Sequence, residues 1–466
     1  MSRRKTKPAK RRALGGKRRL EAPGHPLPAP LLPFPVVGVG ASAGGLEAST
    51  ALLKELPDDA GMAMVVVQHL DPHHKSLLRE LLSRVTNMPV AQVEDGVVPE
   101  MRHVYVIPPD KDVTMRDGVL RLSSRQQTGG RHLPIDRFLT SLAEDRKGAA
   151  IGVILSGTGS DGAAGLRAIR SEGGIAMAQD PSSAQHPGMP QSAIASGCVD
   201  LILPPAEIAR EIVRLARSPH VEWGAAQAEA EAPPKGGEDL QSILQTLSAV
   251  SDIDFALYKT ATIRRQAARR MALRRIGDVQ EYAAYLQENP AEAQALCQDV
   301  LIHVTGFFRD PEAFAALETT VFPKLVAGKP QNEPIRIWVP GCATGEEAYS
   351  IAIALSEFVG KQPDDSRCQI FATDVSAASV DKARLGIYPE AAVSEISPAR
   401  LRRFFVKVGD SYQIGKPVRD LCVFARHDLG KDPPFSRLDL ISCRNVLIYL
   451  GPVLQQRVLS VFHYAL

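Results

Sequence analysis

Short apolar runs alternate along the chain with longer stretches in which apolar positions recur at helical spacing. Runs rich in Val and Ile occupy 36–39, 64–67, 150–155, 335–339 and 369–373, and small or polar residues and then helical periodicity follow them. This alternation is typical of buried parallel strands joined by helices. We therefore expect an α/β protein with two doubly wound, mostly parallel-sheet domains of the Rossmann-like kind, the second preceded by a small helical subdomain.

The apolar periodicity is interrupted between 217 and 238, where Pro219, Ala-Glu alternation and the segment Pro233–Gly237 replace it. Such composition indicates a linker. We predict a basic, disordered leader over 1–34, a first sheet domain over 35–216, a linker over 217–238, a helical subdomain over 239–325 and a second sheet domain over 326–466.

Composition narrows the class of protein. The chain has 466 residues, 44% of them hydrophobic and 23% charged, which is the balance of a globular protein with more than one core. No apolar run reaches the length of about 18 to 20 residues that spans a bilayer. The 6 cysteines lie far apart without C-x-x-C pairs, so neither a disulfide scaffold nor a zinc ribbon is indicated. We expect a cytoplasmic protein without a metal site.

Charge is concentrated at the N-terminus, where residues 1–20 contain ten Lys or Arg and no acidic residue. Such a leader is able to bind nucleic acid or an anionic membrane. No aromatic residue lies among these charges to stack on bases, so a solvated tail is favoured and nucleic-acid binding is not expected.

The segment Gly40–Gly44 follows the first apolar run and places one serine, Ser42, in a turn that leads into a helix. It fits the G-x-S-x-G elbow, in which small neighbours allow a sharp turn to expose a nucleophile near the N-terminus of a helix. The alternative is a glycine-rich turn that only joins strand to helix or cradles a phosphate.

A serine nucleophile needs an imidazole base and a carboxylate that orients it. His69 follows the second apolar run, and Asp161 lies in the glycine-rich turn after the run at 150–155. The carboxyl ends of parallel strands meet in one crevice, so we expect these groups to converge on Ser42. His73, His74 and His186 are rival bases.

The order Ser, His, Asp differs from that of the α/β-hydrolases. Together with the segments Gly40–Gly45, Val67–Leu70, Tyr105–Pro109, Leu155–Ala163 and Gln179–Pro190, it resembles the catalytic domain of the chemotaxis protein-glutamate methylesterases. The resemblance implies that Ser42 is the nucleophile, His69 the base and Asp161 its orienter. It also implies that the substrates are methylated glutamates of chemoreceptors, and in some cases glutamines that are deamidated.

Two residues depart from that family, in which threonine often follows the nucleophile and methionine lies in the glycine turn. This chain has Ala43 and Thr158 at these places, which puts the rate and the oxyanion geometry in question. The esterases usually follow a receiver domain, and here only about 34 residues precede the first strand, so control by phosphorylation within the chain is not expected.

A second strand–turn–helix pattern covers Pro334–Ser350, and the next apolar run ends at Asp374. Small residues in the first turn allow close approach of a ligand, and a carboxylate at the end of the second strand can accept hydrogen bonds from ribose hydroxyls. The turn lacks a full G-x-G-x-x-G, and the acidic residue comes later than is usual for a dinucleotide site. S-adenosylmethionine is therefore favoured over NAD as the cofactor.

Three more segments, His303–Asp310, Phe424–Leu429 and Leu438–Tyr449, resemble the chemotaxis protein-glutamate methyltransferases, and this resemblance runs from about Leu240 to the end of the chain. His303 replaces the asparagine that is usual in the family. The cofactor-binding residues that the resemblance implies are Thr305, Arg309, Glu346 or Glu347, Asp374, Asp428, Leu429, Arg444 and Asn445.

Six arginines recur at helical spacing between 264 and 275, and composition alone indicates a solvated helix face. The resemblance implies instead that Arg269 and Arg270 contact the receptor substrate. It also implies that residues 388–420 form a small β-subdomain that docks on receptors.

The methyltransferase resemblance stops before the last two strands of that class, so we expect a sheet without one edge. Either the chain is a fragment of a longer fusion protein, or the domain borrows strands. Together the segments predict a bifunctional enzyme that removes and installs methyl groups on receptor glutamates. The alternative is a receptor-binding adaptor in which one or both activities are degraded.

Overall fold

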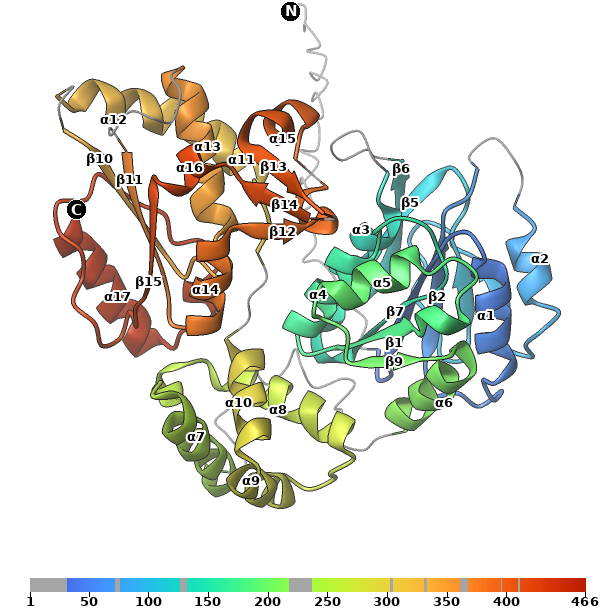
Figure 1. The fold of residues 1–466 in the computed structure, drawn as a ribbon. Helices are drawn as coiled ribbons and strands as arrows, with labels where there is room; N and C mark the ends of the chain where they lie inside the picture. Colours follow the sequence, from blue (N-terminus) through green and yellow to red (C-terminus); the bar gives the residue numbers. More distant parts are fainter. Residues whose placement is uncertain are drawn as a thin grey trace, which may run out of the picture.

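The computed structural model describes residues 32–71, 76–125, 132–217, 237–301, 305–330, 333–360, 368–394, 396–409 and 411–466. The leader up to residue 31, most of the linker, and the histidines at 73, 74 and 303 lie outside the described residues. Figure 1 shows two α/β units and, below them, a group of helices that joins the two. The expected pair of doubly wound sheets with an intervening helical subdomain is confirmed.

The first unit is built on a seven-stranded sheet with the order β3-β4-β2-β1-β7-β8-β9, and the pairings within it are parallel. Its strands are β1 (Val36–Ala41), β2 (Ala63–Gln68), β3 (Val90–Gln92), β4 (Val104–Val106), β7 (Ala150–Ile154), β8 (Ile175–Gln179) and β9 (Leu201–Leu203). A separate antiparallel pair comprises β5 (Lys111–Arg116) and β6 (Val119–Ser124). The strands that follow β1 in the chain lie on its β2 side, and the chain later crosses to the other side of β1 at β7. The strand order therefore reverses at β1, and open α/β sheets bind ligands at such a reversal.

Helices cover both faces of this sheet. They are α1 (Gly45–Lys54), α2 (Leu78–Leu82), α3 (Pro134–Arg146), α4 (Ala163–Ser171), α5 (Gly188–Ala195) and α6 (Pro205–Ala216). Val37 and Val39 of β1 are buried in the same cluster as α1 and α6, whereas Val36 is buried with α3 and α4. Because successive strand residues point to opposite faces, one run of small apolar residues supplies both cores.

The helical subdomain precedes the second sheet. Its helices are α7 (Gly237–Ser251), α8 (Thr260–Arg274), α9 (Val279–Glu288) and α10 (Pro290–Val300). They surround an apolar cluster that includes Leu247, Phe255, Tyr282 and Leu296, each almost fully buried. The short helix α11 (Pro311–Ala316) and then α12 (Phe322–Gly328) lead to the second sheet.

The second unit has a four-stranded parallel sheet with the order β15-β11-β10-β16. Its strands are β10 (Ile335–Pro340), β11 (Cys368–Asp374), β15 (Cys422–Arg426) and β16 (Leu440–Ile441), and its helices include α13 (Glu346–Val359), α14 (Ala377–Leu385) and α17 (Pro452–Ala465). Trp338 of β10 is fully buried against α17, and its indole N–H donates to Thr373 Oγ1 at 2.9 Å, so burial leaves no unsatisfied donor there.

Between β11 and β15 the chain forms a three-stranded antiparallel sheet of β12 (Ile387–Pro389), β14 (Ser411–Ile414) and β13 (Phe405–Val408), with α15 (Pro398–Phe404) and α16 (Lys416–Arg419) beside it. This is the part of the chain in which a small β-subdomain was expected.

Among the described residues, no helix is both long and apolar enough to cross a bilayer.

Candidate functional site

Ser42 directly follows β1, in a turn that the structure holds from several sides. Its backbone N–H donates to the carbonyl of Ser156 at 3.0 Å, and the N–H of Gly45 donates back to the Ser42 carbonyl at 2.8 Å. Gly44 has a φ of 71°, a left-handed conformation that favours glycine, and it caps α1. The elbow predicted from sequence is therefore present as a tight strand-to-helix turn.

His69 and Asp161 meet Ser42 at this edge of the sheet. His69 Nδ1 lies 3.1 Å from Ser42 Oγ, and His69 Nε2 lies 2.7 Å from Asp161 Oδ2. Asp161 is 3% exposed, whereas the His69 side chain is 30% exposed, so the imidazole is reachable from solvent and the carboxylate is not. The contacts fit the imidazole tautomer that carries its proton on Nε2 and presents Nδ1 as an acceptor to the serine hydroxyl.

Asp161 is fixed by backbone donors at the start of α3. The N–H of Ile135 donates to Asp161 Oδ2 at 3.1 Å, and the N–H of Asp136 donates to Oδ1 at 2.9 Å. A buried carboxylate needs such partners, and the N-terminus of a helix also favours negative charge. Asp161 therefore holds the imidazole in one orientation.

A second layer of contacts supports the serine turn. Ser156 Oγ donates to the carbonyl of Ala43 at 2.9 Å and accepts from the N–H of His186 at 2.9 Å. A Cβ placed on Gly157 would lie 2.9 Å from Ser42 Cβ and 2.2 Å from Met189 Sδ. Small residues are thus required beside the serine, and His186, which was a rival base, contributes backbone contacts to this layer.

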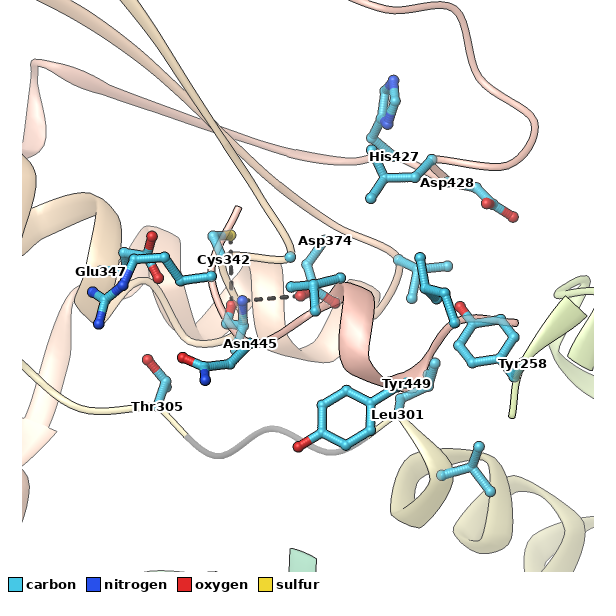
Figure 2. Close-up of a pocket in the computed structure, with 18 of the residues that line it drawn as sticks. Tyr258, Leu301, Thr305, Cys342, Glu347, Asp374, His427, Asp428, Asn445 and Tyr449 are labelled. Atoms are coloured by element: carbon cyan, nitrogen blue, oxygen red, sulfur yellow. Dashed lines mark hydrogen bonds between the residues drawn. The ribbon is translucent and has the colours of Figure 1, made fainter. Parts of the chain in front are cut away.

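A pocket occupies the carboxyl edge of the second sheet. Its lining includes eight of the residues expected to bind the cofactor, namely Thr305, Arg309, Glu347, Asp374, Asp428, Leu429, Arg444 and Asn445. Figure 2 shows Asp374 near the middle of this group, with Glu347 on one side and Tyr258 on the other.

Asp374 ends β11 and is 8% exposed. Its Oδ2 accepts from the N–H of Ala343 at 2.9 Å, and its Oδ1 accepts from the N–H of Ser376 at 2.8 Å. Each carboxylate oxygen can accept a second hydrogen bond, so both remain able to take a ribose hydroxyl.

The end of the pocket near Glu347 is charged. Burial raises the pKa of Glu347 above its ordinary value, although the Ser442 hydroxyl, which donates to Glu347 Oε1 at 2.6 Å, and then the Arg444 and Arg309 guanidinium groups act in the opposite direction. Arg444 is held in place by donating to the carbonyl of Arg309 and to Asp310 Oδ2, each at 2.6 Å. One carboxylate and two guanidinium groups suit a ligand that carries both an ammonium and a carboxylate.

The opposite end of the pocket is mostly apolar and includes the helical subdomain. Tyr258, Val300 and Leu301 come from that subdomain, and Leu450 and Leu454 come from the C-terminal part of the chain. Burial, and then the charges of Asp428 and Asp374, raise the pKa of Tyr258, so its hydroxyl stays protonated at neutral pH. A flat, weakly polar group such as adenine fits this end.

Three of the expected site residues, Glu346, Arg269 and Arg270, make other contacts in the structure. Glu346, offered as an alternative to Glu347, does not line the pocket: it is 4% exposed and accepts from Thr344 Oγ1 at 2.7 Å. Arg269 is not on a solvated helix face, because its side chain is fully buried in ion pairs with Asp200 and Asp299.

Arg270 is also engaged, with Glu292 and Asp299 at 2.5 and 2.8 Å. The structure thus brings neither arginine to an open surface where a receptor could contact it. Tyr258 and Tyr449 line the pocket but were not predicted. Tyr449 ends a segment that resembles the methyltransferases but was given no role, and no motif contains Tyr258.

Comparisons with known proteins match both sheet domains and the helical subdomain. Family models match in three places: CheB methylesterase over residues 37–212, the all-alpha domain of CheR methyltransferase over 238–301, and the SAM-binding domain of CheR methyltransferase over 303–466. The pocket described above falls in the last two ranges. S-adenosylmethionine is therefore the cofactor, as predicted.

Among similar proteins, an uncharacterized 104.1 kDa protein in the hypE 3′ region of Rhodobacter capsulatus is 38% identical over 410 residues, which are 83% of this chain and 42% of that protein. A protein-glutamate methylesterase/protein-glutamine glutaminase 2 of Burkholderia pseudomallei is 37% identical over 215 residues, 46% of this chain and 63% of the relative. A chemotaxis protein methyltransferase of Listeria monocytogenes is 33% identical over 197 residues, 42% of this chain and 73% of the relative.

The chain thus spans less than two thirds of the length of the first two relatives, and most of the length of the third. The three family ranges follow one another from the start of β1 to the end of α17. The chain belongs to the CheR methyltransferase family, and a CheB methylesterase domain precedes its CheR domains.

Proposed function

We propose that the chain is a bifunctional enzyme that hydrolyses glutamate methyl esters with its first domain and methylates glutamates with its second. The observation that supports the hydrolase most directly is the continuous contact from Ser42 Oγ through His69 to Asp161, at 3.1 and 2.7 Å. Three side chains from three separate strand ends have no packing reason to meet in this order, and together they form a proton relay.

In the proposed hydrolysis, His69 Nδ1 takes the proton of Ser42 as Oγ attacks the ester carbonyl. The same proton passes to the leaving methanol, and a water molecule then cleaves the acyl-serine, with His69 again as base. Negative charge on the carbonyl oxygen develops near the N-terminus of α1, which starts three residues after Ser42 and favours an anion.

The second reaction makes different demands. When bound, S-adenosylmethionine supplies a methyl group on a positively charged sulfur. The acceptor glutamate is already ionised at neutral pH, since its reference pKa is about 4.3, so no general base is required. Asp374 would hold the ribose, Glu347 would accept from the cofactor ammonium, and Arg309 and Arg444 would bind its carboxylate. Such positioning can lower the barrier by roughly 7 to 11 kcal/mol.

Opposite reactions on one kind of side chain imply a shared substrate. We propose that this substrate is the helical signalling region of methyl-accepting chemoreceptors, and that the protein works in the cytoplasm, where those regions lie. The methylesterase relative is also named a glutaminase, and the same relay would deamidate a receptor glutamine.

Release of methanol from a methylated receptor tests the hydrolase. Wild type and the matched control Ser83→Ala, at an exposed position away from the site, are expected to release methanol, and Ser42→Ala is expected to be inactive. Titration with S-adenosylmethionine and, separately, with NAD tests the second site, where only the former is expected to saturate. A protein that binds receptors but passes neither test would be an adaptor.

A further inference from the structure

The methylesterase domain is bound to the helical subdomain through α4 and α8, and α8 carries five of the six arginines between 264 and 275. Arg170 of α4 donates to Asp299 Oδ1 at 2.8 Å, and Arg269 of α8 bridges Asp299 and Asp200. Asp200 belongs to the methylesterase domain and Asp299 to α10, so the pairs cross between the domains. We call Arg170, Asp200, Arg269 and Asp299 the interdomain charge cluster.

Three members of this cluster are closed to solvent, whereas the Arg170 side chain is 28% exposed. The side chains of Arg269, Asp200 and Asp299 are 0%, 4% and 2% exposed. Burial raises the pKa of Asp299, but the Arg269 and Arg170 charges outweigh it and hold that pKa below its ordinary value. Asp299 therefore stays ionised and paired with Arg170, Arg269 and Arg270, and the loss of Arg170 would remove the pair by which α4 holds it.

Contacts beside the cluster bring the backbones close. Gln266 Nε2 of α8 donates to the carbonyl of Ser171 at 3.0 Å, and a Cβ placed on Gly173 would lie 3.0 Å from Arg265 Cβ. The contact is nonetheless imperfect, since Arg265 Nε, Gln266 Oε1 and Arg269 Nε are buried without a hydrogen-bond partner among the residues that the structure describes. Each unsatisfied polar atom costs desolvation free energy, so these three atoms lower the net stabilisation that the contact contributes.

The same helix α4 reaches the cofactor pocket. Arg167 Nη1 donates to the carbonyl of Thr305 at 3.2 Å, and Thr305 lines the pocket. Tyr449 also lines the pocket. Its pKa is raised by burial and then by the charge of Glu172. Thr305, Asn445 and Tyr449 lie on one side of the pocket in Figure 2, and the methylesterase domain adjoins it there.

From these contacts we propose that the docked methylesterase domain shields the methyl-transfer site from a protein substrate. This inference rests on the proposed function. Asp374 would hold the cofactor's ribose and Glu347 its amino-acid group, so an acceptor side chain must reach the part of the pocket between these two residues. A small cofactor can enter a pocket whose rim is contacted by α4, but a receptor helix cannot approach until the domains separate.

Two variants of the full chain are designed to separate the domains. Arg170→Ala removes one guanidinium group of the interdomain charge cluster and its ion pair with Asp299. Gly173→Asn leaves every charge in place and inserts a side chain against Arg265; asparagine tolerates the positive φ of 85° at this position. Arg210→Ala is the matched control, because Arg210 pairs with Glu55 within the methylesterase domain at 3.0 Å and is 65% exposed.

Three quantities are measured for each protein: X-ray scattering for the radius of gyration, calorimetric affinity for S-adenosylhomocysteine, and the rate of methyl transfer to receptor. Both interface variants are expected to show a larger radius and transfer that is faster by about threefold or more, with cofactor affinity within about twofold of wild type. Arg210→Ala is expected to behave as wild type in all three.

The outcomes that would count against these ideas are distinct. Opening without faster transfer, or unchanged radius and rate in both variants, would overturn the shielding role. Absence of transfer in every form, open or closed, despite cofactor binding would contradict the proposed function itself. Equal gains in Arg210→Ala would show that the effect does not come from the interface.

Discussion

The two sites of this molecule are assembled in different ways. Ser42, His69 and Asp161 all come from the carboxyl edge of one sheet, and their contacts lie within one domain. The cofactor pocket instead combines the edge of the second sheet with Tyr258 and Leu301 of the helical subdomain.

Chemistry accounts for this contrast. A proton relay works only when its atoms are within hydrogen-bond reach, so its parts must be fixed by one rigid scaffold. Methyl transfer to an ionised acceptor needs enclosure and alignment, and walls from two subdomains can provide both. We therefore expect the first site to be sensitive to small local changes and the second to changes in how subdomains meet.

The sharpest test of the single-scaffold site is Asp161→Asn. An amide at this position presents a donor where Nε2–H needs an acceptor, so the imidazole would adopt the wrong tautomer. We expect kcat for ester hydrolysis to fall about 10⁴-fold, with unchanged affinity for S-adenosylmethionine. Methanol release measures the effect, and Asp59→Asn, at an exposed ion pair, is the control. A loss of less than about tenfold would mean that Asp161 does not orient the base.

The corresponding change in the pocket is Asp374→Ala. It removes two acceptors for ribose hydroxyls, each worth about 1.5 kcal/mol when the acceptor is charged, so we expect about 100-fold weaker binding of S-adenosylhomocysteine. Ester hydrolysis is expected to stay as in wild type. Calorimetry is the measurement, with Asp381→Ala on the exposed side of α14 as control. Equal affinities would exclude a ribose contact.

Gly157→Ala tests how tightly the serine turn is held, and its expected effect on methanol release is smaller. The added Cβ meets Met189 Sδ at 2.2 Å and Ser42 Cβ at 2.9 Å, so the turn must shift. Misplacement of a reacting group by about 1 Å can lower the rate by about 100-fold, and we expect a fall of about 10- to 100-fold in methanol release. Gly61→Ala, whose Cβ would come no closer than 3.9 Å to other atoms, is expected to release methanol at the wild-type rate. Full activity in Gly157→Ala would show that the turn is pliable.

The mildest effect concerns Glu347 and pH. Because burial raises its pKa, Glu347 becomes protonated at a higher pH than an exposed glutamate, and its protonated form cannot pair with the cofactor ammonium. Binding that needs the ionised form is complete above this pKa and is lost as pH falls through it. We expect severalfold weaker binding of S-adenosylhomocysteine at about pH 5.5 than at about pH 7.5, and a weaker but flatter profile in Glu347→Gln. A wild-type profile that matches Glu347→Gln would contradict this assignment.

Sequence patterns could predict much of this molecule because its key residues sit at the ends of apolar runs. Ser42, His69, Asp161 and Asp374 each follow or end a strand, and strand order alone directs such residues to one edge of a sheet. Membership of the methyltransferase family, the methylesterase domain and the cofactor also agree with the motifs, whereas the roles of the individual site residues stay predictions.

What the patterns could not predict depends on contacts between distant parts of the chain. The arginines of α8 have the spacing of a solvated face, and only the position of the methylesterase domain explains why Arg269 is buried. Glu346 and Glu347 are adjacent in a helix and equivalent by motif, yet the packing of α13 sends only one of them to the pocket. Tyr258 reaches the pocket through the fold of the helical subdomain.

The two sides of helix α4 make different contacts. Leu166 and Ile169 are fully buried beneath the first sheet, whereas Arg167 and Arg170 extend toward the methyltransferase. Substitutions at 166 or 169 would damage folding, but substitutions at 167 or 170 would leave the core intact. Under the proposed function, natural variants at these two outer positions would alter the balance between adding and removing methyl groups without any change at either reacting centre.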